Sequence, residues 1–539
     1  MSSIKIDRSN AISFCLKMML LCLVLLYIVH VIGDKEIQSV YNLSFYLFIF
    51  SVFCLINKYL KQESVYIILL AVSSLIESVI VILQLFHVID TGQSVFTVTG
   101  TFGNPGPLGG FMSVCVSVMF PYLIYSKRDS YTALEKIARY TVILALTVSL
   151  VLLPVTKSRA AMLALLLGAF VYFLKYDSIR LFVKRYCILI IVVLSFALYG
   201  AYKIRESSVN GRYLIYKIEL NCIKKNALWG VGPGKWRGEF GLSQKDFFEG
   251  RINIEDGIVN IDPSVEKERM LSDVPRFPFN EFLRVGMELG IIGLLLAVMS
   301  LFMLCGRLKK INSSFFYGVI VLTVFSLFSY PFSLFFFKCF GFLCLSLAII
   351  PISEGEIKKV PWMLVAVITI LFYLSIPVYA HSKAAHYLAI SRPFYQLEDY
   401  EKVVQYYSLI EDEMKDDPDY LLEYGSALLA LDRIEESERL LSDCLKRTND
   451  YRALLFWGDL CFMKNDPKQA EKYYSDAFIM VPNRVKPLEK LAELYYKTND
   501  CERLHNLKAS LDSFVPKIEN DETGTMRSHV DDLYNSCLH

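Results

Sequence analysis

The sequence predicts an all-α protein, with about eleven membrane-spanning helices followed by a helical repeat domain. Three observations lead to this fold class. Of the 539 residues, 54% are hydrophobic and 20% are charged, whereas soluble domains have roughly 45–50% apolar and about 25% charged residues. The apolar residues gather in long runs before residue 380, and a polar segment after it repeats at a period of about 33 residues. We therefore expect a membrane domain over residues 1–379 and a repeat domain over residues 380–539.

Each expected span is a run of about 20 mainly apolar residues, because a bilayer core about 30 Å thick requires a helix of that length. The eleven runs lie near residues 11–33, 39–57, 64–88, 106–125, 138–154, 158–174, 186–203, 281–304, 314–330, 332–352 and 361–379. The first run is long for a signal peptide and no small-residue cleavage site follows it, so we expect it to be retained.

Basic residues predict the orientation of the spans, because they gather in cytoplasmic loops. Lys and Arg fall in alternate loops, at residues 58–61, 127–139, 175–185, 307–310 and 358–359. Lys5 and Arg8 precede the first span, which places the N-terminus in the cytoplasm. With an odd number of spans, the loop of about 204–280 and the tail from residue 380 would both lie on the outer side.

The charges are divided between the two parts of the chain. Residues 380–539 contain 20 Lys and Arg against 30 Asp and Glu, a net charge of −10, which leaves 36 against 24 and a net charge of +12 before them. An acidic tail argues against a nucleic-acid partner there. The upstream positive charge lies mostly between apolar runs, where membrane topology explains it.

Nine of the 13 cysteines lie before residue 350, nearly all in apolar runs and without C-x-x-C spacing. We interpret these nine as small buried hydrophobic residues rather than as a disulfide or zinc framework. No metal site is expected.

The tail repeats in segments 420–425, 454–458 and 488–492, each of which ends in Gly or Ala. This period is typical of tetratricopeptide helix pairs. The small residue at the end of each segment would let two paired helices approach closely. Such stacks present a concave surface to another protein or cap a neighbouring domain, so we expect a protein partner or a capping role, and no catalysis, in the tail.

The most unusual stretch outside the tail is Thr-Gly-Thr-Phe-Gly-Asn-Pro-Gly-Pro-Leu-Gly-Gly at residues 99–110, just before the fourth span. It cannot begin as a regular helix. It predicts either a tight turn followed by close helix packing or a re-entrant backbone that lines a cavity. Gly103, Asn104 and Pro105 are the residues that we assign to such a cavity loop.

Arg159 lies at the outer end of the sixth span, in the segment 156–162. An arginine that enters a membrane helix is costly unless it is paired or hydrated, which makes it a candidate functional residue. The alternative is a side chain that extends to the interface.

The outer loop begins with a basic segment. Seven Lys and Arg against two Glu lie between residues 205 and 237, and Arg212 is among them. This pattern favours an anionic ligand. The segment 230–235 is rich in glycine, but a phosphate-binding loop for nucleotides needs Gly and Ser or Thr where this chain has Trp229 and Trp236. A nucleotide site is therefore not expected.

The loop ends in Asn280 and Glu281, and Glu288 follows Glu281 by seven residues, so both carboxylates lie on one helical face. A carboxylate there can accept a proton from a hydroxyl. Alternatively, it stabilises the N-terminus of a solvated helix.

These motifs, in this order, resemble the O-antigen ligase superfamily of bacterial inner-membrane glycosyltransferases. The resemblance covers about residues 60–350 and rests on residues 100–105, 158–160, 211–212, 230–234, 280–281 and 288–290. The superfamily also includes protein O-oligosaccharyltransferases and is distantly related to O-antigen polymerases. Many ligases have a histidine before the Asn-Glu pair; this chain has Phe279 there, and the loop of 204–280 contains no histidine.

The resemblance implies a metal- and nucleotide-independent transfer of a glycan from an undecaprenyl pyrophosphate carrier, without a cofactor, at the periplasmic face. Pyrophosphate is a good leaving group, so the enzyme mainly neutralises its charge and positions the acceptor. We expect Arg159 and Arg212 to hold the pyrophosphate, since arginine forks suit phosphate oxygens. Glu281 takes or orients the acceptor proton, and Asn280 belongs to the cavity loop.

The acceptor stays open at this point. It is lipid A-core in a lipopolysaccharide ligase, a growing glycan in a polymerase, and a Ser or Thr of a protein in an oligosaccharyltransferase. A third reading is a non-enzymatic scaffold or exporter in cell-envelope assembly, which would show a pathway of intramembrane charges. Few such charges are visible in the sequence.

Overall fold

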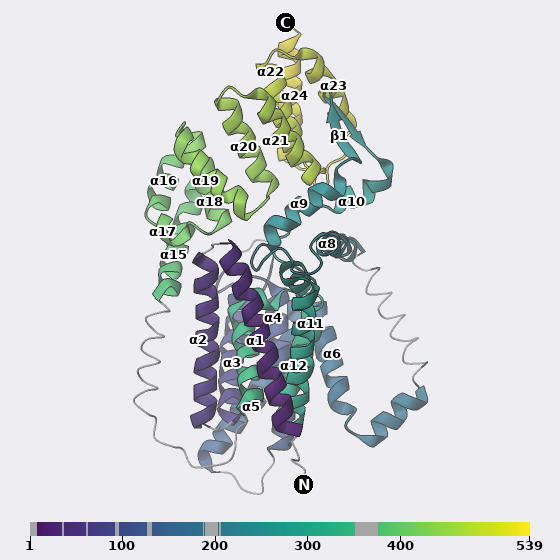
Figure 1. The fold of residues 1–539 in the computed structure, drawn as a ribbon, viewed down its shortest axis with the longest axis vertical. Helices are drawn as coiled ribbons and strands as arrows, with labels where there is room; N and C mark the ends of the chain where they lie inside the picture. The colour runs from purple at the N-terminus through teal and green to yellow at the C-terminus, as the bar shows by residue number, and fades with distance from the viewer. Residues whose placement is uncertain are drawn as a thin grey trace. The chain divides into compact units, whose positions relative to one another are not determined.

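The computed structural model describes residues 8–34, 37–60, 63–91, 96–126, 132–186, 206–350 and 376–538, together with positions 188 and 203. Its contacts group the chain into two compact units (Figure 1). Residues 1–204 and 277–371 form the first, which we call the apolar unit. Residues 205–276 and 372–539 form the second, which we call the repeat unit. The segment expected to be a long outer loop is thus grouped with the tail.

The apolar unit is a bundle of helices. Its helices are α1 (Arg8–Asp34), α2 (Ile37–Leu60), α3 (Glu63–Leu85), α4 (Pro105–Tyr125), α5 (Ala133–Leu152), α6 (Arg159–Phe173), α11 (Glu281–Lys310), α12 (Phe315–Ser326) and α13 (Phe335–Ile349). Short 3-10 turns separate some of them, namely η1 (Gly100–Phe102), η2 (Leu153–Thr156) and η4 (Pro331–Ser333).

Five helices among the described residues are long and apolar enough to cross a membrane, within α1, α3, α4, α5 with η2, and α11. A sixth candidate is α6 together with a helix over Asp177–Tyr186, bent by 116°, and three shorter apolar helices lie over Tyr46–Lys58, α12 and α13. The all-α membrane fold is confirmed. The number of eleven spans stays a prediction, since the runs near 186–203 and 361–379 lie largely outside the described residues.

Helix α4 lies at the centre of the apolar core, with most of its residues buried. A Cβ atom at Gly110 would lie 2.3 Å from the ring of Phe325 in α12. Only glycine permits this approach, and small residues that let backbones approach are typical of helix packing in membranes. The helix begins where the sequence allows, because Asn104 accepts a hydrogen bond from the backbone N–H of Gly106 and Pro105 occupies the first turn.

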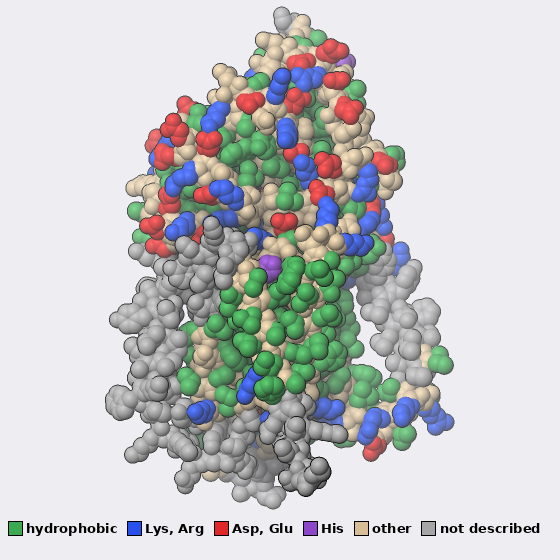
Figure 2. Space-filling model, viewed as in Figure 1, with side chains coloured by type: hydrophobic (Ala, Val, Ile, Leu, Met, Phe, Trp, Pro, Cys, Tyr) green, Lys and Arg blue, Asp and Glu red, His purple; other side chains and the backbone are tan. Residues whose placement is uncertain are grey.

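The two units have different surfaces on the face drawn in Figure 2. Hydrophobic side chains cover most of the described part of the apolar unit, whereas basic and acidic side chains alternate over the repeat unit. Large exposed residues of the apolar unit include Phe14, Leu166 and Phe302. A continuous apolar surface of this kind is expected where lipid replaces water.

The repeat unit is built from consecutive helix pairs. Its tail helices are α15 (Ile376–Gln396), α16 (Tyr400–Ser408), α17 (Glu411–Met414), α18 (Pro418–Ala430), α19 (Ile434–Arg447), α20 (Tyr451–Met463), α21 (Pro467–Met480), α22 (Lys486–Lys497), α23 (Cys501–Ser513) and α24 (Asp521–Cys537). The close approach predicted at the small residues is confirmed in two pairs: a Cβ at Gly425 would lie 2.9 Å from Leu441, and one at Gly458 would lie 2.4 Å from Tyr474. The tetratricopeptide assignment itself stays a prediction.

A disulfide joins Cys501, the first residue of α23, to Cys537, the last residue of α24, with 5.9 Å between the Cα atoms. It joins α24 covalently to α23, the helix that precedes it. The sequence analysis considered only the cysteines before residue 350 and did not predict this bond.

Residues 206–276 fold as part of the repeat unit. They form α8 (Glu206–Lys225), α9 (Trp236–Phe248), the antiparallel strands β1 (Ile252–Glu255) and β2 (Ile258–Ile261), η3 (Pro263–Val265) and α10 (Glu266–Leu271). Helix α9 packs against α19 and α21, and β2 packs against α23. The side chain of Gln244 donates to the backbone carbonyl of Met480 at 2.8 Å, and the Ser510 hydroxyl accepts from the N–H of Val259 at 3.1 Å. The strands add a small hairpin to a chain predicted to be all helical.

Candidate functional site

The glycine-rich stretch at residues 99–110 is held by two polar side chains of α3. Gln84 Oε1 accepts hydrogen bonds from the N–H groups of Thr99 and Gly100, each at 2.9 Å. Glu77 accepts from the N–H of Thr101 at 3.0 Å and from the Thr101 hydroxyl. Buried polar groups require partners, so α3 supplies those that this irregular backbone cannot find within itself.

Glycine is required at residue 100 for two reasons. The backbone there has φ of +56°, and a Cβ atom would lie 2.5 Å from the Glu77 carboxylate. Gly103 also has a positive φ of 65° and closes the short turn before Asn104. The structure therefore brings Gly103, Asn104 and Pro105 together as the turn that starts α4, which is the tight-turn reading of the motif.

A cavity of about 470 Å³ lies beside this turn and is lined by Thr101 and Phe102, but not by Gly103, Asn104 or Pro105, so the assignment of these three residues to a cavity loop stays a prediction. Phe102, Phe111 and Phe336 make one part of its lining apolar, while Glu77 and Thr101 contribute polar atoms. Ligand pockets commonly combine an apolar lining with a few fixed polar groups.

Arg159 is the first residue of α6 and its side chain is exposed. The neighbouring Ser158 hydroxyl donates to the backbone carbonyl of Gly106 at 3.2 Å. A Cβ at Gly109 would lie 2.6 Å from Ser158. The two motifs around residues 100–110 and 156–159, far apart in sequence, are thus in direct contact. The N-terminus of α6 adds a partial positive charge beside Arg159, which suits an anion.

Asn280 and Glu281 start α11. The Asn280 side chain accepts from the N–H groups of Phe282 and Leu283 at 2.9 and 3.1 Å. Glu281 is 4% exposed; one carboxylate oxygen accepts from the N–H of Phe332 at 2.7 Å, and the other pairs with Arg284 at 2.8 Å. Glu281 is therefore fixed in the apolar unit rather than solvated, and Asn280 acts as the helix cap.

Glycine also ends the first segment of α11, because Gly290 has φ of 68° and breaks the helix. Glu281 and Glu288 lie in the regular turns before this break, as their spacing predicted. Phe279, at the position where related ligases have histidine, packs edge-on against Tyr330 with 5.9 Å between ring centroids. An aromatic side chain that does not titrate thus occupies the position where many ligases have a titratable histidine.

Arg212 lies on α8 of the repeat unit and is half-buried. Tyr216 and Glu219 follow it at intervals of four and three residues, on nearly the same helical face. Burial raises the pKa of the Tyr216 phenol to about 12, and the charge of Arg212 opposes that rise. Glu219 is fully buried and accepts from the indole N–H of Trp236 at 2.8 Å. The carboxylate therefore fixes the turn after residue 230 against the helix that carries Arg212.

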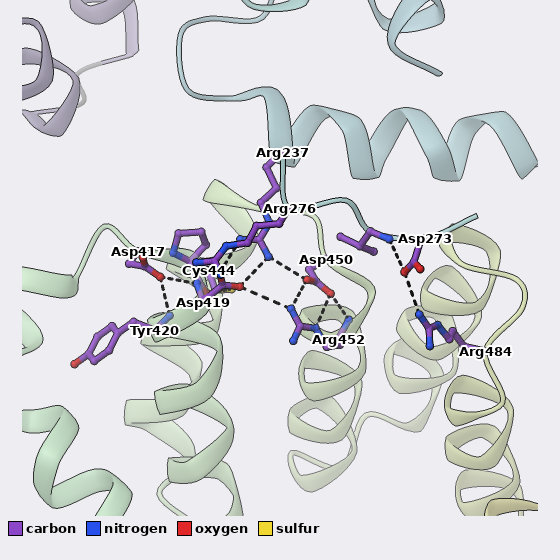
Figure 3. A network of polar contacts seen from close by, with 12 residues as sticks. Arg237, Asp273, Arg276, Asp417, Asp419, Tyr420, Cys444, Asp450, Arg452 and Arg484 are labelled. Atoms are coloured by element: carbon purple, nitrogen blue, oxygen red, sulfur yellow. Dashed lines mark hydrogen bonds and ion pairs between the residues drawn. The ribbon is translucent and has the colours of Figure 1, made fainter. Parts of the chain in front are cut away.

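Several basic residues of the outer loop are used in ion pairs within the repeat unit. Lys217 pairs with Glu268 at 3.1 Å, and Lys225 pairs with Asp246 at 2.5 Å. Figure 3 shows Arg237 between two aspartates, with distances of 2.8 Å to Asp419 and 3.5 Å to Asp450, which also pairs with Arg452. The expected anion-attracting face is thus smaller than the sequence count suggested, because carboxylates of residues 206–276 and of the tail neutralise part of it.

The ion pair with Arg237 also affects the pKa of Asp419. Burial would raise the pKa of Asp419, but hydrogen bonding and charge from Arg237 outweigh it and lower this pKa. Asp273 behaves likewise: burial opposes the shift, while Lys517 and Arg484 lower its pKa. Both carboxylates remain ionised well below neutral pH.

One cluster in the described residues has side chains of the type that bind metals. Ligand atoms of Glu489, Glu493 and His529 lie within 4.8 Å of one another. However, Lys486 pairs with Glu489 at 2.7 Å and Lys490 pairs with Glu493 at 3.2 Å. These lysines already compensate the carboxylate charge, so we assign the cluster a structural role.

These features define an all-α, multi-pass membrane protein with glycine-containing motifs and buried carboxylates at the ends of its helices. Residues 142–298 match the family model described as O-antigen ligase. The matched segment runs from α5 into α11 and includes Arg159, Arg212, Asn280 and Glu281. The match supports the O-antigen ligase superfamily, which the motifs of residues 100–290 also indicated. Among curated proteins, no match was found.

The match suggests glycan transfer in the assembly of envelope polysaccharide, since the O-antigen ligase family implies a polyprenyl-linked glycan as substrate and a glycan or lipid as acceptor. The sequence analysis missed Glu77 and Gln84. An available signal was their position: a carboxylate and an amide inside an otherwise apolar run, just before an irregular glycine-rich segment.

Proposed function

We propose that this protein transfers a glycan from undecaprenyl pyrophosphate to an acceptor at the periplasmic face of the bacterial inner membrane. The observation that carries the proposal is the O-antigen ligase match over residues 142–298, a segment that includes Arg159, Arg212 and Glu281, to which we assign the reaction. The acceptor stays open, and lipid A-core is the first one to test, with Phe279 at the position where many ligases have a histidine as the observation against it.

In the proposed reaction, the acceptor hydroxyl oxygen bonds to the anomeric carbon of the donor glycan. The bond from that carbon to the pyrophosphate oxygen breaks, and undecaprenyl pyrophosphate leaves with the electron pair. The proton of the acceptor hydroxyl passes to a base. The enzyme contributes mainly by stabilising the departing negative charge and by holding the two substrates in line.

Arg159 and Arg212 are the proposed pyrophosphate ligands. Arg159 is exposed at the N-terminus of a helix, where backbone N–H groups add to its positive charge. Arg212 is half-buried on a face that it shares with Tyr216, so its guanidinium is partly shielded from water. A partly dehydrated arginine binds phosphate oxygens more strongly than an exposed one does.

Glu281 is the proposed acceptor-side residue. Arg284 and the Phe332 N–H hold both of its oxygens, which supports orientation of the acceptor proton by a fixed carboxylate. Glu77 is a positioning residue in this proposal, since it holds Thr101 and with it the turn beside the cavity.

Two observations support the periplasmic location of the repeat unit. Basic residues fall in alternate loops on the opposite side. The Cys501–Cys537 bond belongs to the class of bonds that persist in oxidising compartments and are rare in the cytosol.

The test uses purified protein, an undecaprenyl-pyrophosphate-linked glycan with a radiolabelled sugar, and lipid A-core. Lipid extraction then reports whether the label has left the carrier. We expect Arg212→Ala to reduce transfer by about a hundredfold or more at unchanged protein abundance, and Arg392→Ala, an exposed arginine in α15, to have full activity. Full transfer by Arg212→Ala would overturn its assigned role, and label that stays on the carrier with every acceptor would overturn the proposed reaction.

Polymerisation is the second candidate, and Phe279 is the observation that favours it, because the histidine of many ligases is absent. In the same assay, a polymerase would leave the label on the carrier in longer chains. Label on a Ser or Thr of an envelope protein would instead identify a protein oligosaccharyltransferase.

A further inference from the structure

We propose that the repeat unit contains a carbohydrate-binding groove that holds an uncharged segment of the glycan. This inference rests on the proposed function, because it assumes that the protein handles a glycan. The groove has a cavity of about 290 Å³ and is lined mainly by α18, α20 and α22, with further residues from α15, α16 and α21. It is separate from every residue assigned above to the transfer reaction.

Aromatic side chains form a large part of the groove. Tyr395, Tyr400, Phe456 and Phe462 all line it and are only partly buried. A partly buried ring in a concavity presents an apolar surface on which a flat, weakly polar ligand can pack. Sugar rings are such ligands, because one face of a pyranose carries mainly C–H groups.

Fixed polar groups lie between the rings. Asp459 accepts from the Tyr474 hydroxyl at 2.7 Å and pairs with Lys490 at 3.1 Å, and Lys490 also pairs with Glu493 at 3.2 Å. Because these groups hold one another in place, hydroxyl groups of a ligand would meet donors and acceptors that are already oriented. This lowers the entropic cost of binding.

The charge of the groove argues for an uncharged ligand. Its charged lining residues are Asp459, Glu493, Lys490 and Lys497, two acids and two bases. A peptide terminus or a phosphate would meet no excess of opposite charge. None of the lining residues belongs to β1 or β2, so an extended peptide finds no strand edge to pair with here. A neutral oligosaccharide satisfies both the rings and the balanced polar groups.

The experiment measures binding of a defined probe to the full-length protein in nanodiscs. The probe is the oligosaccharide released by mild acid from the carrier-linked glycan of the same cells, and binding is measured by calorimetry. Phe462→Leu removes a groove ring while keeping apolar volume, and Asp459→Asn removes one carboxylate charge. Tyr473→Leu is the matched control, since Tyr473 is a half-buried aromatic residue of α21 that does not line the groove.

We expect each groove variant to weaken binding by about tenfold, and the control to bind as the wild type does. Equal binding by all variants would overturn the inference. So would a groove-dependent affinity for peptides of envelope proteins with none for the glycan, which would make the groove a protein-docking site. Should Phe462→Leu unfold on heating earlier than the control, Phe456→Leu provides an independent variant.

The transfer assay on the same preparations separates the two proposals. Transfer without groove-dependent binding would support the proposed function and overturn the proposed carbohydrate-binding groove. Groove-dependent binding by a protein that never moves label from the carrier would do the reverse.

Discussion

The apolar unit and the repeat unit solve the problem of buried polar groups in different ways. In the apolar unit, a few side chains accept hydrogen bonds from backbone N–H groups of irregular segments. Gln84 and Glu77 accept from residues 99–101, and Glu281 accepts from Phe332. In the repeat unit, ion pairs connect one helix to the next, as around Arg237 and Asp419. Lipid cannot replace a lost partner, whereas water can.

This difference predicts where a substitution affects transfer and where it affects stability. The contacts of Gln84, Glu77 and Glu281 hold the turns that the proposed function uses, so a single substitution there should lower transfer, and it should also leave a buried polar group without a partner. Contacts of the repeat unit are numerous and partly exposed, so single substitutions should affect stability in small steps, and only removal of a whole element should be severe. Five predictions, in order of decreasing effect, test this difference between the apolar unit and the repeat unit.

Removal of residues 380–539 should abolish transfer. Helices α9 and α10 would lose their buried contacts to the tail, including Gln244 with Met480 and Arg269 with the carbonyl of Pro482. Limited proteolysis should then cleave residues 206–276. The full-length Arg212→Ala protein is the inactive control, and the same residues should stay protected in it. A truncated protein with wild-type activity would show that the loop folds without the repeats.

Replacement of Glu77 by Gln should lower transfer by about a hundredfold, since small displacements of positioning elements have effects of this size, while abundance changes little. Glu135→Gln, an exposed residue in the first turn of α5, is the matched control and should transfer normally. Equal activity of the two variants would show that the turn at residue 101 does not require the carboxylate.

Replacement of Cys501 and Cys537 by Ser should destabilise the repeat unit by about 4 kcal/mol, given a loop of 36 residues. Thermal unfolding with and without reductant measures the effect. In cells, alkylation of thiols before and after reduction should show an oxidised pair if the tail is periplasmic, and free thiols in that assay would contradict the proposed topology.

The substitution Gly241→Ala should destabilise the repeat unit by about 1–3 kcal/mol, because its Cβ would lie 2.0 Å from the backbone oxygen of Asn449. Gly524→Ala in α24 meets no atom within 4 Å and should be neutral or stabilising by up to about 1 kcal/mol. Similar unfolding temperatures for both variants would show that α9 does not pack closely against the repeats.

Acid should weaken the repeat unit by a smaller amount. The pKa values of Asp419 and Asp273 are lowered in the folded state, so their contribution is present above the unfolded value of about 3.9 and is lost as the pH falls through the lowered folded values. Pulse proteolysis from neutral to acidic pH measures it. Arg237→Gln should reduce this acid dependence, and an unchanged profile would exclude the Arg237 pair as its cause.

Sequence reasoning predicted the architecture better than the site. The helix pairs followed from a period and from small residues such as Gly425 and Gly458, because both patterns are local. Asn104 and Asn280 were predicted to belong to a cavity loop, and their side chains cap the helices α4 and α11 in the structure. Glu77 was missed, since nothing local indicates that it faces Thr101, 24 residues further along the chain.

The sequence alone was enough to predict a helical membrane protein with an acidic helical tail and a resemblance to the O-antigen ligase superfamily. Run length, charge alternation and motif order carry that information along the chain. Three features required the three-dimensional structure: residues 206–276 fold with the tail, Cys501 is bonded to Cys537, and α3 supports the glycine turn. Such contacts join residues far apart in sequence, and they depend on which surfaces fit together rather than on any local period.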